Sequence, residues 1–457
     1  MSDALKDDRL DAVAEHHNVA QFVSFGPGAD PRVRHRRLRG DPPTAAPGAD
    51  VPTAVTALLA RAPGGVNVRT FRPDHPKGNP FDYGLTTADD AVALVRRRAA
   101  EGFHVIVNET LDVHDGGVSG VLLGDVAELV PGDTPRGVER PGAATLPRPL
   151  AERLLAIVYG AEPDWPAGPG RRVEVSVHPG RVGYRGGRTV VWEVEDVAGG
   201  HTVAGSVTWP NALSRLLGDK AFGLLVADLL GERVPATLVL PRDLPPFRFG
   251  EPTDGERPGR VWTRTAPREP DAGRHPTLSR WTDPFRLMAE ADPAGDHLAS
   301  LLVQDGVAAR HSGAAAYDPA TGTDVVESVP GTGDAFMLGR RRPTDPPVDV
   351  GRRVREALRR LAGALGGVRL EWADDGDRLW VLQLHRTRAA MAPGVFNAGE
   401  PAAGWLRFTP SDGLGSLRDL LVRAHAEGRG VLVTEPVGVT SHVGDLIRAA
   451  GVPGRLA

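Results

Sequence analysis

The sequence predicts an α/β protein made of two related halves and a smaller C-terminal α/β domain. Two observations support this class. Short sequence blocks recur in the same order, and short apolar runs alternate with segments whose Leu, Ala and Val residues recur at helical spacing. A chain of 457 residues is also too long for one ordinary core. Breaks near 198–204 and 390–404 predict domains at 1–200, 201–392 and 393–457.

The repeat consists of four pairs of blocks. In chain order they match 66–70 (VNVRT) with 261–265 (VWTRT), 105–123 with 301–317, 127–142 with 326–343, and 172–195 with 368–385. Glu128 and Glu327 are each followed by x-Val-Pro-Gly, and Glu174 matches Glu371. A repeated unit buries its sheet with the same turns, so matched residues are expected on equivalent strands. The pairs predicted to be equivalent are Glu174 with Glu371 and Arg69 with Arg264.

The second half gives the clearer element pattern. Runs bounded by Gly, Pro or Asp predict strands at 237–240, 261–265, 299–304 and 378–384. Leu, Ala and Val at three-to-four spacing, ending in Gly, predict helices at 211–232 and 350–367. Stretches rich in Pro and Gly predict loops at 40–52, 242–258 and 341–348.

The composition narrows the class of partner. A net charge of -4 with 25% charged residues creates no global field that would attract nucleic acid or an anionic membrane. The absence of Cys excludes disulfides, thiolate metal sites and a thiol nucleophile. The N-terminus lacks the apolar run of a signal peptide, and no stretch approaches the roughly 18 apolar residues of a membrane span. We expect a cytoplasmic protein that acts on a small molecule.

Lysine is rare, because only Lys6, Lys77 and Lys220 stand among 54 Lys and Arg residues. A compact ammonium serves purposes that a planar guanidinium does not. Lys220, on a Gly-containing approach to a helix, is therefore a candidate phosphate ligand. Lys6 in a polar N-terminal tail is attributed to chance.

The strings around Lys220, Arg264 and Gln304, followed by the glycine loop GTGDAFMLG and by LEWADDGDRLWVLQLHR, resemble the ATP-binding part of the pyruvate phosphate dikinase and phosphoenolpyruvate synthase family. The resemblance covers roughly 205–390 and implies an ATP-grasp fold that binds ATP and Mg²⁺. It places Lys220 and Arg264 on the phosphates as catalytic cations. The other residues that it places at the nucleotide are Gln304, Asp305, Glu327, Gly331, Gly333 and Arg386, with Glu371 and Gln383 as Mg²⁺ ligands.

This set suits phosphoryl transfer, which needs cations on the phosphate oxygens and Mg²⁺ held by oxygen ligands. A hairpin that pairs Ala373 with Asp377 would put Glu371 and Gln383 on one face. The family has Gln-x-Arg-Pro where this chain has Gln383-Leu-His-Arg386, so the last arginine is displaced by one position.

The first half shows no lysine in the segment PTAVTALLARAPGG, so we expect it to lack an equivalent of the Lys220 helix and to bind ATP poorly. It is either a degenerate duplicate or a second nucleotide site that uses Arg69 and Lys77. Its remaining candidate ligands are Glu109, Glu128, Glu174 and Glu193. The basic cluster RVRHRR at 32–37 is expected to be a solvated loop, with a site for an acidic ligand as the alternative.

The C-terminal segment VTEPVGVTSHVGDLIRAAGVP, at 433–453, is similar to the swivelling phosphohistidine domain of the same family. The resemblance implies that His442 accepts a phosphoryl group and passes it on. A neutral imidazole is a suitable nucleophile for such a two-step transfer. This domain has only about 60 residues, and Val437 replaces one glycine of the motif.

The sequence therefore predicts an ATP-dependent phosphotransferase, dikinase-like, with Mg-ATP in the second half and His442 as a phosphoryl relay. Two alternatives stay open. One is an ATP-grasp ligase that forms an acyl phosphate. The other is a nucleotide-binding protein that does not turn over.

Overall fold

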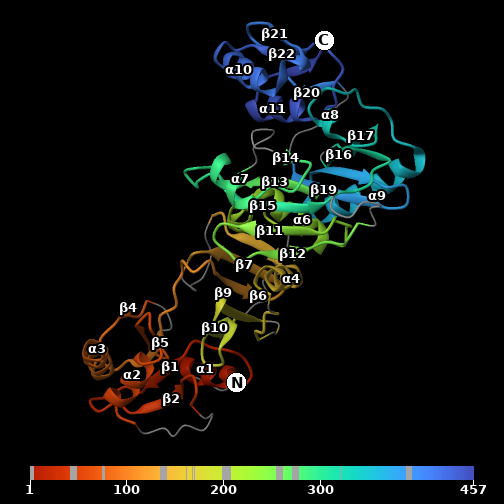
Figure 1. Cartoon of the computed structure of the whole chain (residues 1–457). Coiled ribbons are helices and arrows are strands. Elements are labelled where there is room, and N and C mark those ends of the chain that lie inside the picture. The colour runs from red at the N-terminus through yellow and green to blue at the C-terminus, as the bar shows by residue number, and fades with distance from the viewer. Residues whose placement is uncertain are drawn as a thin grey trace. The chain divides into compact units, whose positions relative to one another are not determined.

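The computed structural model describes residues 5–41, 49–74, 78–133, 141–160, 162–166, 168, 170–197, 207–253, 261–269, 277–319, 321–387 and 394–457. The chain is mixed α/β, as predicted, and divides into two compact units, Met1–Gly205 and Ser206–Ala457 (Figure 1). The predicted break at 198–204 lies outside the described residues, so the predicted domain limits stay predictions. Within the described ranges, none of the helices is long and apolar enough to cross a membrane.

The first unit contains two antiparallel five-stranded sheets. The first has the order β2-β1-β5-β3-β4 and the second β10-β9-β6-β7-β8. Its helices are α1 (Lys6–Ala14), α2 (Val51–Leu59), α3 (Ala88–Ala100) and α4 (Arg148–Tyr159). Its strands are β1 (Phe22–Phe25), β2 (Val33–Arg37), β3 (Val66–Phe71), β4 (Phe81–Leu85), β5 (His104–Glu109), β6 (Val118–Leu123), β7 (Val126–Pro131), β8 (Ala144–Pro147), β9 (Arg171–Val182) and β10 (Gly187–Asp196).

The second unit begins with the same kinds of sheet, in the orders β12-β11-β15-β13-β14 and β17-β16-β18-β19. Its helices are α5 (Ala212–Leu217), α6 (Asp219–Leu229), α7 (Pro284–Ala291), α8 (Asp334–Met337) and α9 (Val348–Leu365). Its strands are β11 (Thr237–Pro241), β12 (Phe247–Phe249), β13 (Val261–Pro267), β14 (Thr277–Leu278), β15 (Leu298–Asp305), β16 (His311–Asp318), β17 (Thr323–Pro330), β18 (Val368–Asp374) and β19 (Leu379–Arg386).

The C-terminal part of this unit, which we call the tail and which covers residues 394–457, forms a small sheet in the order β20-β23-β22-β21. Its elements are β20 (Val395–Asn397), β21 (Trp405–Phe408), the 3₁₀ helix η1 (Pro410–Asp412), α10 (Gly413–Ala426), β22 (Gly430–Val433), α11 (His442–Ala450) and β23 (Gly454–Leu456). Pairs β21–β22 and β22–β23 are parallel. The apolar faces of α10 and α11 pack into the core of this small α/β domain.

The two units repeat one topology. Strands β1 to β5 take the sheet positions of β11 to β15, and β6, β7, β9 and β10 take those of β16, β17, β18 and β19. The position of β8 corresponds to a single bridge between Ser328 and Thr344. The register agrees residue by residue: Arg69 pairs with Ile106 as Arg264 pairs with Leu302. The predicted duplication is therefore confirmed.

The helices show why patterning located some elements and missed others. Helix α9 follows the predicted segment because its buried residues recur every three to four positions. The predicted helix 211–232 is instead two helices, because Gly218 has a φ of 89° and breaks it before α6. A Cβ on Gly218 would lie 2.7 Å from Ala266. The predicted loop 242–258 contains β12.

Candidate functional site

A cavity of about 1210 Å³ lies within the first unit, between side chains of its two sheets. A space of this size accommodates a nucleotide or a similar ligand. Charged and polar residues dominate one part of its wall, and aromatic residues of β4 contribute to another. The charged and polar side chains in this wall include Lys6, Arg69, Asn108, Asp115, Glu128, Arg172, Glu174, Ser176, His178, Glu193 and Glu195.

Lys6 begins α1, which directly precedes β1 as α6 precedes β11. It is therefore the counterpart of Lys220, the second residue of α6. Its ammonium pairs with Glu193 and lies 3.4 Å from Glu195. Two expectations were wrong: Lys6 is not an idle residue of a polar tail, and the first half does have the lysine helix.

The basic cluster 32–37 holds α1 in place. It forms β2 instead of a solvated loop, which corrects that expectation. Arg34 Nε donates to Asp7 at 2.8 Å, and Arg37 Nε donates to Asp11 at 2.6 Å. Burial alone would raise the pKa of Asp11, but hydrogen bonds from His35 and Arg37 lower it to about 2. These ion pairs attach the acidic face of α1 to β2 and so position Lys6.

In the first unit, a row of charged side chains joins both sheets. We call it the polar row, and it consists of Lys6, Arg69, Arg172, Glu174 and Glu193. Arg69 on β3 donates to the backbone oxygen of Trp192 at 2.9 Å, and it lies 3.5 Å from Glu193. Glu193 pairs directly across the sheet with Glu174. Arg172 donates to Glu174 at 2.8 Å. The row thus places two facing carboxylates among three cations beside an open cavity.

The two carboxylates titrate differently for physical reasons. Burial, and then the charge of Glu193, raises the pKa of Glu174. Burial also acts to raise the pKa of Glu193, but Arg69 and Lys6 outweigh it and lower that pKa. Paired carboxylates of this kind offer hard oxygen ligands to Mg²⁺. The donor set therefore fits a divalent cation with bound phosphates.

The second unit has the equivalent row of polar side chains, but there the side chains bind one another instead of bordering an open cavity. Arg264 donates to Gln383 Oε1 at 2.6 Å and to the backbone oxygen of Leu382 at 2.7 Å, and it lies 3.5 Å from Glu371. Glu371 pairs with Gln383 across the sheet as Glu174 pairs with Glu193. Its own cavity measures only about 90 Å³. The side chains here bind one another and leave little room for a ligand.

Glu371 and Gln383 share a face, as predicted, although the hairpin register differs from the one considered. Ala373 pairs with Trp380 instead of Asp377, and a bulge next to Glu371 brings the two predicted ligands directly opposite each other. Burial opposes ionisation of Glu371, but Arg264 and Arg369 lower its pKa. Among the described residues, Glu371 Oε1 finds no hydrogen-bond donor.

The other predicted nucleotide ligands are only partly brought together. Gln304, Asp305 and Gly333 line the small cavity of the second unit, whereas Gly331 and Lys220 are not among its lining residues. Lys220 is half-buried at the start of α6. Arg386 Nη1 lies 3.5 Å from the backbone oxygen of Val207. Because side chains alternate along a strand, Arg386 lies on the opposite face from His385.

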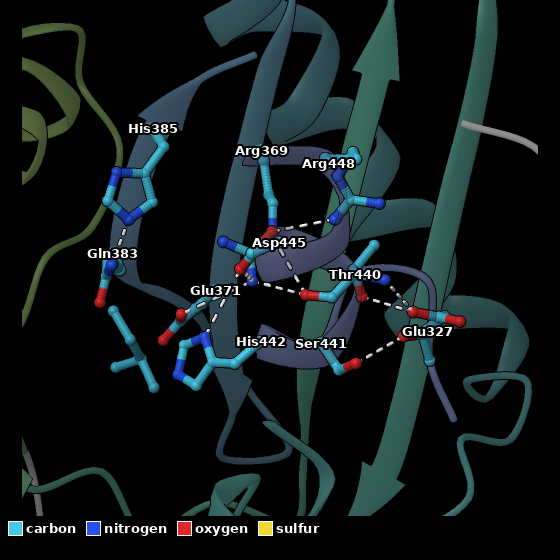
Figure 2. A network of polar contacts seen from close by, with 12 residues as sticks. Glu327, Arg369, Glu371, Gln383, His385, Thr440, Ser441, His442, Asp445 and Arg448 are labelled. Atoms are coloured by element: carbon cyan, nitrogen blue, oxygen red, sulfur yellow. Dashed lines mark hydrogen bonds and ion pairs between the residues drawn. The ribbon is translucent and has the colours of Figure 1, made fainter. Parts of the chain in front are cut away.

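Glu327 and His442 both belong to the contact between the tail and the rest of the second unit. Both oxygens of Glu327 accept hydrogen bonds from residues 439 and 440 of the tail, so this carboxylate serves as a docking group (Figure 2). His442 opens α11, and its Nδ1 lies 3.5 Å from Asp445. Figure 2 shows its ring beside Glu371.

In the first half, Lys77 lies outside the described residues. Glu109 is buried and accepts from the backbone N–H of Gln21 at 2.8 Å, and burial raises its pKa. Its counterpart by register is Asp305. Glu128 takes the register position of Glu327. Of these carboxylates, Glu128 lines the large cavity.

One polar chain in the cavity was missed from the sequence. His178 Nδ1 lies 2.7 Å from Asp115, and its Nε2 lies 2.9 Å from Ser176 Oγ, which accepts from Trp192 Nε1 at 2.7 Å. This chain ties the connection between β5 and β6 to β9. The alternation Glu174, Ser176, His178 along one strand face was the available signal.

Comparison with known proteins gives only partial matches. No protein-family model and no curated protein matches the chain. The D-alanine–D-alanine ligase from Bacillus anthracis complexed with ATP is 14% identical over 40% of this chain and 60% of that chain, with a TM-score of 0.26. The D-alanine–D-alanine ligase from Helicobacter pylori is 9% identical over 38% of this chain and 53% of that chain, with a TM-score of 0.26.

A D-cycloserine synthetase is 19% identical over 43% of this chain and 63% of that chain, with a TM-score of 0.25. These matches span less than two thirds of the solved proteins. At such TM-scores the likeness supports no argument about activity.

Proposed function

We propose that the protein is an ATP-dependent enzyme with two ATP-grasp-like units and that the first unit holds the working Mg-ATP. One observation carries the proposal. Lys6, Arg69, Glu174 and Glu193 face a cavity of about 1210 Å³, at the positions that the family resemblance assigns to nucleotide ligands in the second unit. The proposal moves the nucleotide from the second half, where the sequence placed it, to the first.

The side chains have roles that follow from their charges. Lys6 and Arg69 hold phosphate oxygens and offset the charge that develops during transfer. Glu174 and Glu193 hold Mg²⁺, which when bound neutralises phosphate charge and orients the groups. Lys6 pairs with Glu193 in the structure and would turn to a phosphate when ligands enter. Preorganised cations in a partly buried site act more strongly than in water.

Two reaction classes fit this site. In a phosphotransferase, the γ-phosphoryl group passes to an acceptor. In a ligase, a carboxylate attacks it, ADP leaves, and an amine then displaces phosphate from the acyl phosphate. Release of ADP that depends on two co-substrates supports the ligase, whereas one acceptor suffices for the phosphotransferase.

Relay through His442 is the second candidate. Asp445 lies 3.5 Å from its Nδ1 and can orient the ring, so that Nε2 would be the nucleophile. The relay requires the phosphoryl donor to bind in the second unit, beside Glu371. It predicts an acid-labile, base-stable phosphoprotein that the His442→Ala variant does not form.

The lysines test the main proposal because they are matched. Binding of a non-hydrolysable ATP analogue with Mg²⁺ is measured by calorimetry for Lys6→Met and Lys220→Met. We expect Lys6→Met to weaken binding about 10- to 100-fold, since it removes a charge-assisted contact, and Lys220→Met to leave it within about twofold. The reverse pattern would return the working site to the second unit.

A further inference from the structure

The tail is attached to the second unit through a carboxylate. Glu327 Oε1 accepts from the backbone N–H of Val439 at 2.9 Å. Glu327 Oε2 accepts from the backbone N–H of Thr440 at 2.9 Å and from the Thr440 hydroxyl. Three donors on one carboxylate form a strong, directional attachment, because hydrogen bonds to charged groups are about twice as strong as neutral ones. We call this contact the latch.

A second contact beside the latch is also ionic. Arg369 on β18 donates from Nε to the backbone oxygen of Thr440 at 3.1 Å, and it lies 3.1 Å from Asp445 (Figure 2). Arg369 is only 5% exposed, so this ion pair is shielded from solvent. Asp445 also pairs with Arg448 at 2.9 Å. The tail thus presents backbone N–H donors to the Glu327 carboxylate and the Asp445 carboxylate to the Arg369 guanidinium.

The loop that contains Gly438, Val439 and Thr440, which we call the latch loop, packs closely against Phe336 and Glu327, which form its seat. A Cβ on Gly438 would lie 2.4 Å from the ring of Phe336 and 2.7 Å from Glu327 Oε2. Side chains longer than glycine would therefore push the loop off its seat. With the loop seated, α11 begins at His442, whose ring stands beside Glu371.

The first unit shows the same positions without a tail. Glu128 and Arg172 correspond by register to Glu327 and Arg369, and both line the large cavity. Arg172 donates a hydrogen bond to Glu174 at 2.8 Å, whereas Arg369 forms an ion pair with Asp445 of the tail. Positions that bind the tail in one unit thus border an open site in the other. The two cavities measure about 1210 and 90 Å³.

We propose that the tail is a gate on a latent second nucleotide site: with the latch closed, His442 and the seated loop keep a nucleoside triphosphate from the Arg264–Glu371 row, and the site opens when the latch is released. This inference rests on the proposed function, since it takes the second row to be a nucleotide site like the first. It also sets the condition for a His442 relay, because the donor enters only after release.

The experiment first measures the latch without nucleotide. Hydrogen exchange of the Val439 and Thr440 amides is followed in the full chain. Glu327→Gln, and separately Thr440→Val, should accelerate exchange roughly 10- to 100-fold, because each removes hydrogen bonds to a charged group. Glu128→Gln, the matched change in the first unit, should leave these amides protected. Unchanged exchange in both latch variants would overturn the latch.

Nucleotide entry is then measured with the first site weakened. In a Lys6→Met background with the native latch, the magnesium complex of a non-hydrolysable ATP analogue should bind only at the weakened first site, and additional binding should appear when Glu327→Gln is added. Adding Lys220→Met should weaken it again. Two binding events in the background alone, or no additional binding once exchange shows the latch open, would overturn the gate. The single Lys6→Met variant reports separately on the first site, so failure of either proposal is distinguishable.

Discussion

At the scale of single residues, the duplication provides an internal comparison. Arg69 and Arg264 occupy equivalent register positions. Each donates to the backbone oxygen of the bulged residue in its own unit, which is Trp192 for Arg69 and Leu382 for Arg264. Bulges of this kind re-aim side chains next to functional sites. Their surroundings differ, however, because Arg69 borders an open cavity and Arg264 is 9% exposed and surrounded by acceptors.

The two arginines should therefore respond differently to the same change. Arg264→Gln removes the nearer of the two guanidinium groups beside the buried carboxylate of Glu371 and leaves only Arg369, which should destabilise the second unit by up to about 3–5 kcal/mol. Arg69→Gln should cost less stability and should instead weaken binding of the magnesium complex of a non-hydrolysable ATP analogue. Chemical denaturation and calorimetry measure the two effects. Equal losses of stability in both variants would refute this contrast.

At the scale of elements, α1 depends on charge to present Lys6. Hydrogen bonding to Asp11 is the largest influence on the pKa of His35, and although burial opposes it, the pKa rises above its ordinary value of 6.5. Asp7, Asp8, Asp11 and Arg34 are the charged groups around this ring. A raised folded-state pKa means that protonated His35 stabilises the docked helix.

Stability should accordingly depend on pH in a defined direction. The contribution of His35 is complete below about pH 6.5 and is lost as the pH rises through its higher folded-state pKa. We expect the free energy of unfolding of the first unit to fall over that window and the His35→Gln variant to lose this dependence. Denaturant titrations between pH 6 and 9 measure it. A dependence that the variant retains would assign it to another group.

The elements also show the limits of the sequence. The strands that carry Arg264, Glu371 and Gln383 were predictable because apolar runs and a turn define them. The lysine helix of the first unit was not predictable. Helix α2 lies between β2 and β3, where the described residues of the second unit carry no helix. This insertion hid the match of Lys6 with Lys220. The basic run 32–37 could not be placed either, since its partners on α1 become visible only in three dimensions.

At the scale of the whole molecule, the two units share one topology but differ in the volume of the cavity beside the polar row. The first unit keeps an open cavity, whereas in the second unit Arg264 binds Gln383 within the equivalent row and the cavity is small. Cavity size follows from side-chain packing, which no sequence motif encodes. The family resemblance therefore pointed to this row of residues as candidate ligands and placed the nucleotide in the half that has the smaller cavity.

A structure of the full chain with Mg²⁺ and a non-hydrolysable ATP analogue tests this most directly. The account predicts the nucleotide in the first unit, with its phosphates at Lys6 and Arg69 and the metal at Glu174 and Glu193. The second unit should keep Arg264 on Gln383 and the latch closed. A nucleotide bound at Arg264 and Glu371, with the first cavity empty, would contradict it.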